Sequence, residues 1–142
     1  MIDTNIFIHV LLDRELLAET SAQVLSLSEN RRFDGFVTAS CITDIFYIIK
    51  KTLRDAEVTK QIMQNLLKTV FVAGVDETCI RRALDSDWSD FEDSVQHEVA
   101  QQIRADFIIT RNQTNVRINY IINFINIHKY FGLNFYMINI SI

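Results

Sequence analysis

Short apolar runs separated by longer amphipathic stretches constrain the fold of this chain more than any other feature. Residues 36–39, 70–73 and 106–110 predict buried strands, because each is a brief apolar run rich in β-branched or aromatic residues. The stretches between these runs predict helices. Strands joined by helical crossovers normally lie parallel in one sheet. The pattern therefore predicts an α/β fold with a parallel sheet flanked by helices on both faces.

The helices themselves are marked by apolar residues three or four positions apart. We expect helices over residues 6–12, 16–30, 40–53, 56–67, 76–83 and 90–103. Ser40, Asp76 and Asp90 are expected to cap three of these helices, since short polar side chains accept hydrogen bonds from backbone N–H groups at a helix start. A further strand is expected over residues 135–142, which are rich in β-branched and aromatic residues.

The length and the cysteine usage bound the class of protein. The chain has 142 residues, no Pro and no linker-like run, so we expect one domain, because domains commonly hold roughly 100–200 residues. Cys41 and Cys79 follow no metal or redox spacing. The chain has no apolar window of about 18 residues and no secretory signal pattern. These features favour a cytoplasmic protein with no membrane partner.

The net charge of the chain limits how it could bind the phosphate backbone of a nucleic acid. It carries 18 acidic and 14 basic residues, a formal net charge of −4. Proteins that bind nucleic acid through backbone electrostatics alone are usually basic. A nucleic-acid enzyme of this composition therefore needs another source of positive charge, and a divalent cation is the obvious one.

Several acids are placed at the predicted ends of strands or starts of helices. Asp3 follows a short first strand at residues 1–2, and Asp44 lies one turn into the helix that follows the second strand, at residues 36–39. Asp90 and Asp93 begin the helix that precedes the fourth strand, at residues 106–110. In open parallel sheets, ligands bind beyond the carboxyl ends of the strands. Clustered oxygen ligands suit a hard cation such as Mg²⁺ or Mn²⁺. For each acid taken alone, helix capping or a favourable helix-dipole position is the more common explanation.

Four motifs then resemble the PIN-domain family. Residues 1–6 (MIDTNI) resemble its DTN opening, and residues 38–47 (TASCITDIFY) resemble its second motif. Residues 90–96 (DFEDSVQ) are similar to DFEDALQ, and residues 105–112 (ADFIITRN) are similar to GADYIVTRN. The motifs occur in the family's order and spacing. They place a PIN domain core over residues 1–112, with residues 113–142 as an atypical C-terminal segment.

The resemblance implies a Rossmann-like nuclease fold and a metal-dependent endoribonuclease, as in VapC-type toxins of toxin–antitoxin pairs. It implies that Asp3, Asp44 and Asp93 are the catalytic acids that hold Mg²⁺ or Mn²⁺. Asp90 lies one helical turn before Asp93 and is a further candidate ligand. Asn112 stands where the family has a fourth acid, so a second metal is in question.

The remaining implications concern substrate and partners. Thr4, Asn5, Thr110 and Arg111 are expected to hold the ligands in place or to orient the substrate. The substrate implied is RNA, cleaved to leave a 5′ phosphate and a 3′ hydroxyl. A cognate antitoxin protein and a homodimer are left open as partners.

The C-terminal segment departs from the family. Residues 112–142 contain seven Asn, eight Ile and no acid, and the usual family ending is not recognisable. One hypothesis is a shifted reading frame near residue 113. Translating the two other frames from that codon tests it, since one of them should restore an acidic PIN-like ending.

Two other classes of function stay open from the sequence. The first is a PIN-like module with weakened catalysis that binds RNA or a protein, which Asn112 and the altered ending favour. The second is a phosphatase or receiver-like protein using Asp3, although the paired acid and the Lys that this class needs are not recognisable. Cys41 with a His as a nucleophilic pair has no supporting motif.

Overall fold

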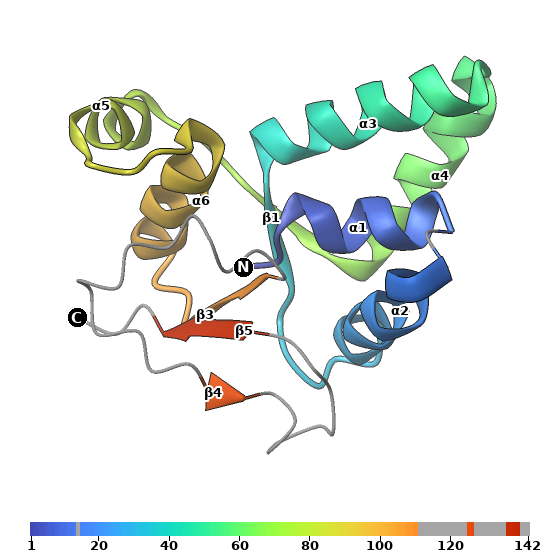
Figure 1. Cartoon of the computed structure of the whole chain (residues 1–142), viewed down its shortest axis with the longest axis horizontal. Coiled ribbons are helices and arrows are strands. Elements are labelled where there is room, and N and C mark those ends of the chain that lie inside the picture. The colour runs from blue at the N-terminus through green and yellow to red at the C-terminus, as the bar shows by residue number, and fades with distance from the viewer. Residues whose placement is uncertain (14, 111–124, 127–135, 140–142) are drawn as a thin grey trace. The chain divides into compact units, whose positions relative to one another are not determined.

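The structure, a computed structural model, describes residues 1–13, 15–110, 125–126 and 136–139 (Figure 1). The chain divides into two compact units. The N-terminal unit comprises residues 2–72, and the C-terminal unit comprises Met1 together with residues 73–142. None of the described helices is long and apolar enough to cross a membrane.

The N-terminal unit is mainly helical. Its elements are α1 (Thr4–Leu11), α2 (Glu15–Glu29), β1 (Phe36–Thr38), α3 (Ala39–Leu53), α4 (Ala56–Thr69) and the start of β2 (Phe71–Ala73). Helix α1 packs against α2 and α3, and α4 packs against α2 and α3. Strands β1 and β2 pair in parallel across the crossover formed by α3 and α4. At the start of β2, the Phe71 N–H donates to the Gly35 carbonyl at 2.8 Å. At the start of β1, the Phe36 carbonyl accepts from the Ile2 N–H at 2.7 Å.

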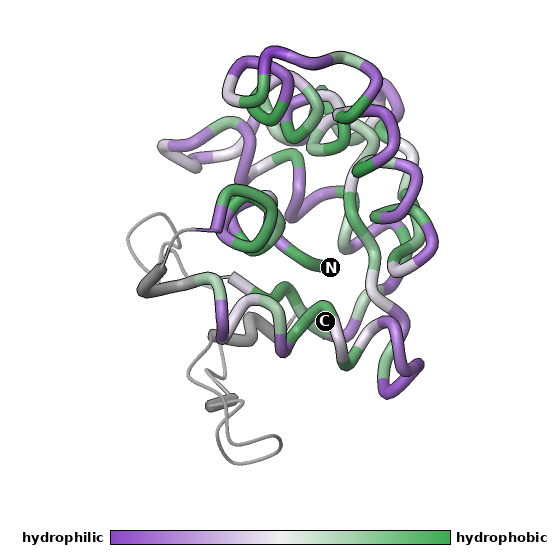
Figure 2. Tube along the Cα trace, turned by 90° about the vertical axis from the view of Figure 1, so that its right-hand side faces the viewer, coloured by the Kyte–Doolittle hydropathy of each residue, from purple (hydrophilic) through white to green (hydrophobic). Residues whose placement is uncertain are grey.

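Apolar residues spaced at helical intervals are buried in this unit. Ile6 on α1 and Ile45 and Ile49 on α3 are fully buried, and so is Val37 on β1. Ile45 and Ile49 are four residues apart, so they share one face of α3. Hydrophobic and hydrophilic residues alternate along the helical coils (Figure 2). The amphipathic pattern in the sequence therefore corresponds to the burial pattern.

The C-terminal unit combines two helices with a small sheet. Its elements are α5 (Glu77–Asp85), α6 (Phe91–Gln102), β3 (Phe107–Thr110), β4 (Ile125–Asn126) and β5 (Tyr136–Asn139). Helix α6 packs against α5, and the strand order is β3-β5-β4. Strand β5 is antiparallel to β3, with Phe107 opposite Asn139 and Thr110 opposite Tyr136.

Met1 also pairs with β3. Its N-terminal ammonium donates to the Phe107 carbonyl at 2.7 Å, and its carbonyl accepts from the Ile109 N–H at 2.8 Å. Burial lowers the pKa of this ammonium to about 5, while the nearby Asp106 carboxylate acts in the opposite direction.

The α/β fold class is confirmed, and all six predicted helices are present within a few residues of their expected bounds. The cap predicted at Ser40 is wrong. The helix begins at Ala39, and Thr38 is its cap, with Oγ1 accepting from the Cys41 N–H at 3.2 Å. Thr38 is fully buried at the end of β1, where its cap bond is shielded from water.

The predicted parallel pairing is present between β1 and β2, and the C-terminal unit has an antiparallel pair as well. The predicted strand over residues 135–142 is confirmed for Tyr136–Asn139, but it runs antiparallel to β3. An antiparallel pair needs no helical crossover, whereas a parallel neighbour does.

Candidate active site

Asp3 is the N-cap of α1. It is only 3% exposed, and its Oδ1 accepts a hydrogen bond from the Asn5 backbone N–H at 3.2 Å. Burying a carboxylate is costly unless hydrogen bonds or charges compensate it. The cap bond and the positive end of the helix dipole supply part of that compensation. The capping role is therefore real, and a cation would compensate the buried charge further.

The two residues after Asp3 differ in accessibility. Thr4, the first residue of α1, is buried, whereas Asn5 is exposed. The Asn5 backbone serves the Asp3 cap, and its exposed side chain is open to solvent. Of the two, Asn5 is thus the better placed to meet a ligand, and Thr4 to hold the start of α1 in place.

Asp44 lies near the start of α3 and is exposed. Within the part of the chain that the structure describes, its carboxylate forms no hydrogen bond or ion pair. The neighbouring Thr43 side chain donates to the Ser40 carbonyl at 2.6 Å, which leaves capping to Thr38. Asp44 therefore has no structural task that explains it among the described residues, in contrast to Asp3.

Asp90 and Asp93 lie together at the start of α6. Asp90 is the N-cap, and its Oδ1 accepts from the Asp93 backbone N–H at 3.1 Å. Both side chains are half-buried. The helix dipole favours negative charge at this end. The predicted cap is confirmed, and the same arrangement places two carboxylates within one helical turn.

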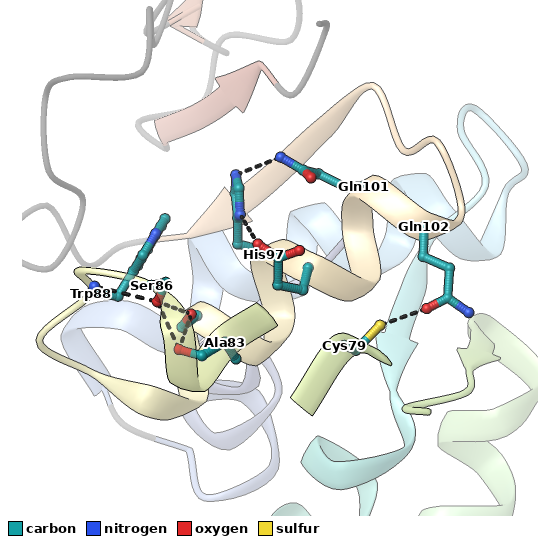
Figure 3. A network of polar contacts seen from close by, with 9 residues as sticks. Cys79, Ala83, Ser86, Trp88, His97, Gln101 and Gln102 are labelled. Carbon is teal, nitrogen blue, oxygen red and sulfur yellow. Dashed lines mark hydrogen bonds and ion pairs between the residues drawn. The ribbon is translucent and has the colours of Figure 1, made fainter. Parts of the chain in front are cut away.

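A serine pair joins the end of α5 to the start of α6 (Figure 3). The Ser86 and Ser94 hydroxyls are 2.8 Å apart, and Ser86 donates to the Ala83 carbonyl at 2.8 Å. Ser94 follows Asp93 directly and is buried. This contact fixes the first turn of α6, which carries Asp90 and Asp93, against α5. The DFEDSVQ motif contains Ser94, but its partner is separated from it by a loop, so the sequence alone does not indicate the pair.

His97 is buried one turn further along α6 and takes part in a side-chain cluster (Figure 3). Its ring centroid is 5.1 Å from that of Trp88. Nδ1 lies 3.4 Å from Glu98 Oε1, and Nε2 lies 3.4 Å from Gln101 Nε2. These contacts give His97 a packing role on α6. Together with the serine pair, they hold the helix that carries Asp93.

The remaining polar groups are the Asp76 cap of α5 and the two cysteines. Asp76 caps α5 as predicted, and the hydrogen bond from the Cys79 backbone N–H lowers the pKa of its carboxyl. Burial raises the pKa of the Cys79 thiol. Cys41 is buried too. A thiol with a raised pKa is a poor nucleophile, so Cys79 does not suit covalent catalysis.

The last motif is described only in part. Thr110 ends β3 and is buried. Arg111 and Asn112 lie outside the described residues, as does most of the segment that follows them. Their expected roles at the end of the strand stay predictions.

The donors fit a hard cation by their chemistry, because all of them are carboxylate or amide oxygens. Asp3 and Asp44 belong to the N-terminal unit, and Asp90 and Asp93 to the C-terminal unit. Among the residues that the structure describes, no three His, Cys, Asp or Glu side chains form a group that could hold a metal ion. At the start of α6, a hydrogen bond links two of the predicted ligands, Asp90 and Asp93.

Comparison with known proteins gives one match. The family model described as "PIN domain" matches residues 1–114. Neither the curated proteins nor the solved structures gave a significant match. Since the match covers most of the chain, the protein belongs to the PIN-domain family. PIN domains are generally nucleases that act on nucleic acids and typically use divalent metals.

Proposed function

We propose that this PIN-domain protein is a divalent-metal-dependent endoribonuclease that hydrolyses RNA phosphodiester bonds. The observation that carries the proposal is the start of α6, where Asp90 and Asp93 lie within one turn in the family's acidic motif. The buried Asp3 at the start of α1 supports it, because a buried carboxylate at a helix end is well suited to meet a cation.

In this proposal Asp3, Asp44 and Asp93 are the catalytic acids, and they hold Mg²⁺ or Mn²⁺ with help from Asp90 and Asn112. When bound, the cation lowers the pKa of a water molecule and neutralises charge on the phosphate oxygens. With the cation bound, the carboxylates would orient a water molecule for attack on phosphorus. The bond from phosphorus to the 3′ oxygen breaks, which leaves a 5′ phosphate and a 3′ hydroxyl.

Other residues of the motifs handle the substrate. Thr4 and Thr110 are buried and are assigned to holding the ligands in place. Asn5 is exposed and is assigned to contact with RNA. Arg111 supplies a positive charge to a chain whose net charge is −4. Phosphate recognition therefore depends on this arginine and on the cation rather than on a basic surface.

The cellular role that fits best is the toxin of a toxin–antitoxin pair in the cytoplasm. It rests on the resemblance of the four motifs to VapC-type toxins. Cys41 and Cys79 form no disulfide with each other, which suits a reducing compartment. A cognate antitoxin and a second copy of this chain are the partners this role would require or allow.

A second candidate is a PIN-like module with weakened catalysis that binds RNA or a protein. Asn112 favours it, because an amide stands where the family has a fourth acid and brings no negative charge to a metal site. In that case the chain would bind RNA without cleaving it.

One experiment separates the two candidates. End-labelled single-stranded RNA is incubated with the purified full chain in Mn²⁺, in Mg²⁺ and in EDTA, and binding is measured in parallel by fluorescence anisotropy. The nuclease predicts cleavage that requires the metal, with 5′ phosphate on the new ends. Binding with no cleavage in either metal would overturn the nuclease and support the binding module.

A further inference from the structure

Gln96 is a buried amide with unusual surroundings. It lies on α6 and is only 2% exposed. Within the described part of the chain, neither its Nε2 nor its Oε1 has a hydrogen-bond partner. Nearly all buried polar side-chain atoms in folded proteins are bonded to protein or to ordered water. An amide left with neither a donor nor an acceptor contact therefore points to a bound water or ligand.

The position of Gln96 on α6 relates it to Asp93. The two residues are three positions apart, so they are neighbours on one face of the helix, with Cβ atoms about 5–6 Å apart. Helical side chains lean toward the N-terminus of the helix. The long Gln96 side chain therefore extends toward the turn that carries Asp93.

The other buried polar side chains on this part of α6 have partners. The Ser94 hydroxyl meets Ser86, and the His97 ring meets Glu98 and Gln101. Gln96 is thus the residue of these turns whose polar atoms are not accounted for by the described protein groups. A water molecule, which donates and accepts, would satisfy both of its amide atoms.

We propose that Gln96 is a positioning residue for Asp93: its carboxamide holds an internal water whose hydrogen bonds fix the orientation of the Asp93 carboxylate for the cation. This inference rests on the proposed function and adds to it a residue outside the predicted ligand set. Residues that orient a metal ligand typically change metal affinity about 10–100-fold when they are replaced. Gln96 should act on the metal through Asp93 without touching RNA.

Calorimetric titration of Mn²⁺ into the full chain tests the inference. Gln96→Met removes both amide atoms at similar length, and we expect its Kd for Mn²⁺ to rise about 10–100-fold. Its thermal midpoint should stay close to that of the wild type, since the lost hydrogen bonds to the internal water are offset by burying an apolar side chain in place of an amide. Gln64→Met makes the same substitution at an exposed position on α4, which plays no part in the proposed site, and should leave the Kd unchanged. An unchanged Kd in Gln96→Met overturns the inference.

Two further variants complete the test. Gln96→Asn keeps the amide but shortens its reach, so it should weaken Mn²⁺ binding less than Gln96→Met does; an equal or greater loss contradicts a role for the amide. If Gln96→Met does not fold, the Kd of Gln96→Asn for Mn²⁺ is the measurement that tests the inference. Asp93→Asn distinguishes a failure of the role inferred for Gln96 from a failure of the proposed function. If it loses Mn²⁺ affinity while Gln96→Met does not, only the inference fails. If Asp93→Asn binds as the wild type does, the proposed function fails with it.

Discussion

Gly35→Ala is expected to destabilise the N-terminal unit sharply, although it adds a single methyl group. Gly35 is buried just before β1, and its carbonyl accepts the Phe71 N–H. A Cβ at this position would overlap the Ser28 hydroxyl, and it would lie 2.9 Å from Ile2 Cδ1 and 3.1 Å from Ser28 Cβ. The Ile2 methyl is the end of a flexible side chain and can shift. Ser28 is fully buried and has little room to do so.

The magnitude follows from two contributions. Overpacking a well-packed site typically costs about 1–3 kcal/mol. The Ser28 hydroxyl also donates to the Thr69 carbonyl at 2.9 Å, and displacing it forfeits a bond worth about 1 kcal/mol. The free energy of unfolding should therefore fall by about 2–4 kcal/mol. For a chain of this length, that corresponds to a drop of roughly 6–15 °C in the thermal midpoint.

Urea unfolding followed by far-ultraviolet circular dichroism measures the change. Gly74→Ala is the matched control, because a Cβ at Gly74 meets no atom within 4 Å. It should stay within about 0.5 kcal/mol of the wild type. Ser28→Ala combined with Gly35→Ala should lose less than the sum of the single losses, since it removes the hydroxyl that the new methyl strikes. A Gly35→Ala protein as stable as the Gly74→Ala control would refute the reasoning.

Three more predictions follow from the site and the charges. Asp44→Asn should abolish most RNA cleavage while leaving the thermal midpoint unchanged, because the exposed carboxylate has no bond among the described residues; a clear loss of stability would indicate a structural role instead. Asn112→Asp should raise Mn²⁺ affinity in a titration, as it restores the fourth acid; equal affinities would exclude the side chain from the site. The Met1 amine, with its pKa lowered from 8.0 to about 5, binds more protons in the unfolded than in the folded chain over that pH range. The free energy of unfolding should therefore rise by up to about 4 kcal/mol between pH 5 and 8, and a flat urea midpoint over this range would contradict it.

Local sequence rules predicted the helices and strands of this fold well, but they predicted the wrong N-cap for α3. Asp76 and Asp90 cap their helices as expected, because each lies directly before an amphipathic stretch. Thr38 and Ser40 both qualify at the start of α3, and their hydroxyls are 2.9 Å apart. The intrinsic N-cap preferences of Thr and Ser do not decide which of the two residues caps the helix. Thr38 is the cap because it lies at the buried end of β1, which is an effect of tertiary structure.

The contacts that support the candidate site could not be predicted from the sequence, because they too depend on tertiary packing. The Ser86 to Ser94 pair and the contact of Trp88 with His97 depend on how α5 packs on α6. The unbonded amide of Gln96 is visible only once its surroundings are known. By contrast, Asp90 and Asp93 could be predicted as neighbours, because three positions make one turn of a helix.

The C-terminal segment is the part of the chain for which the sequence pattern was least informative. The family match ends at residue 114, and β5 pairs with β3 beyond it. We propose that residues 1–112 form the PIN domain core and that residues 113–142 complete it. Helical crossovers predict parallel strands, and that rule says nothing about β5, which pairs with β3 in the antiparallel direction.

The most direct test of the account compares two neutralised acids in the first turn of α6. Asp93→Asn and Glu92→Gln each remove one negative charge from the same helix end, so both lose a similar helix-dipole contribution. Cleavage of labelled RNA in Mn²⁺ is measured for both variants and for the wild type, with thermal midpoints as a check on folding. We predict that Asp93→Asn loses cleavage on the order of 10²-fold or more while Glu92→Gln retains it. Equal rates for the two variants, with both folded, would contradict the assignment of Asp93 to a metal-dependent nuclease site.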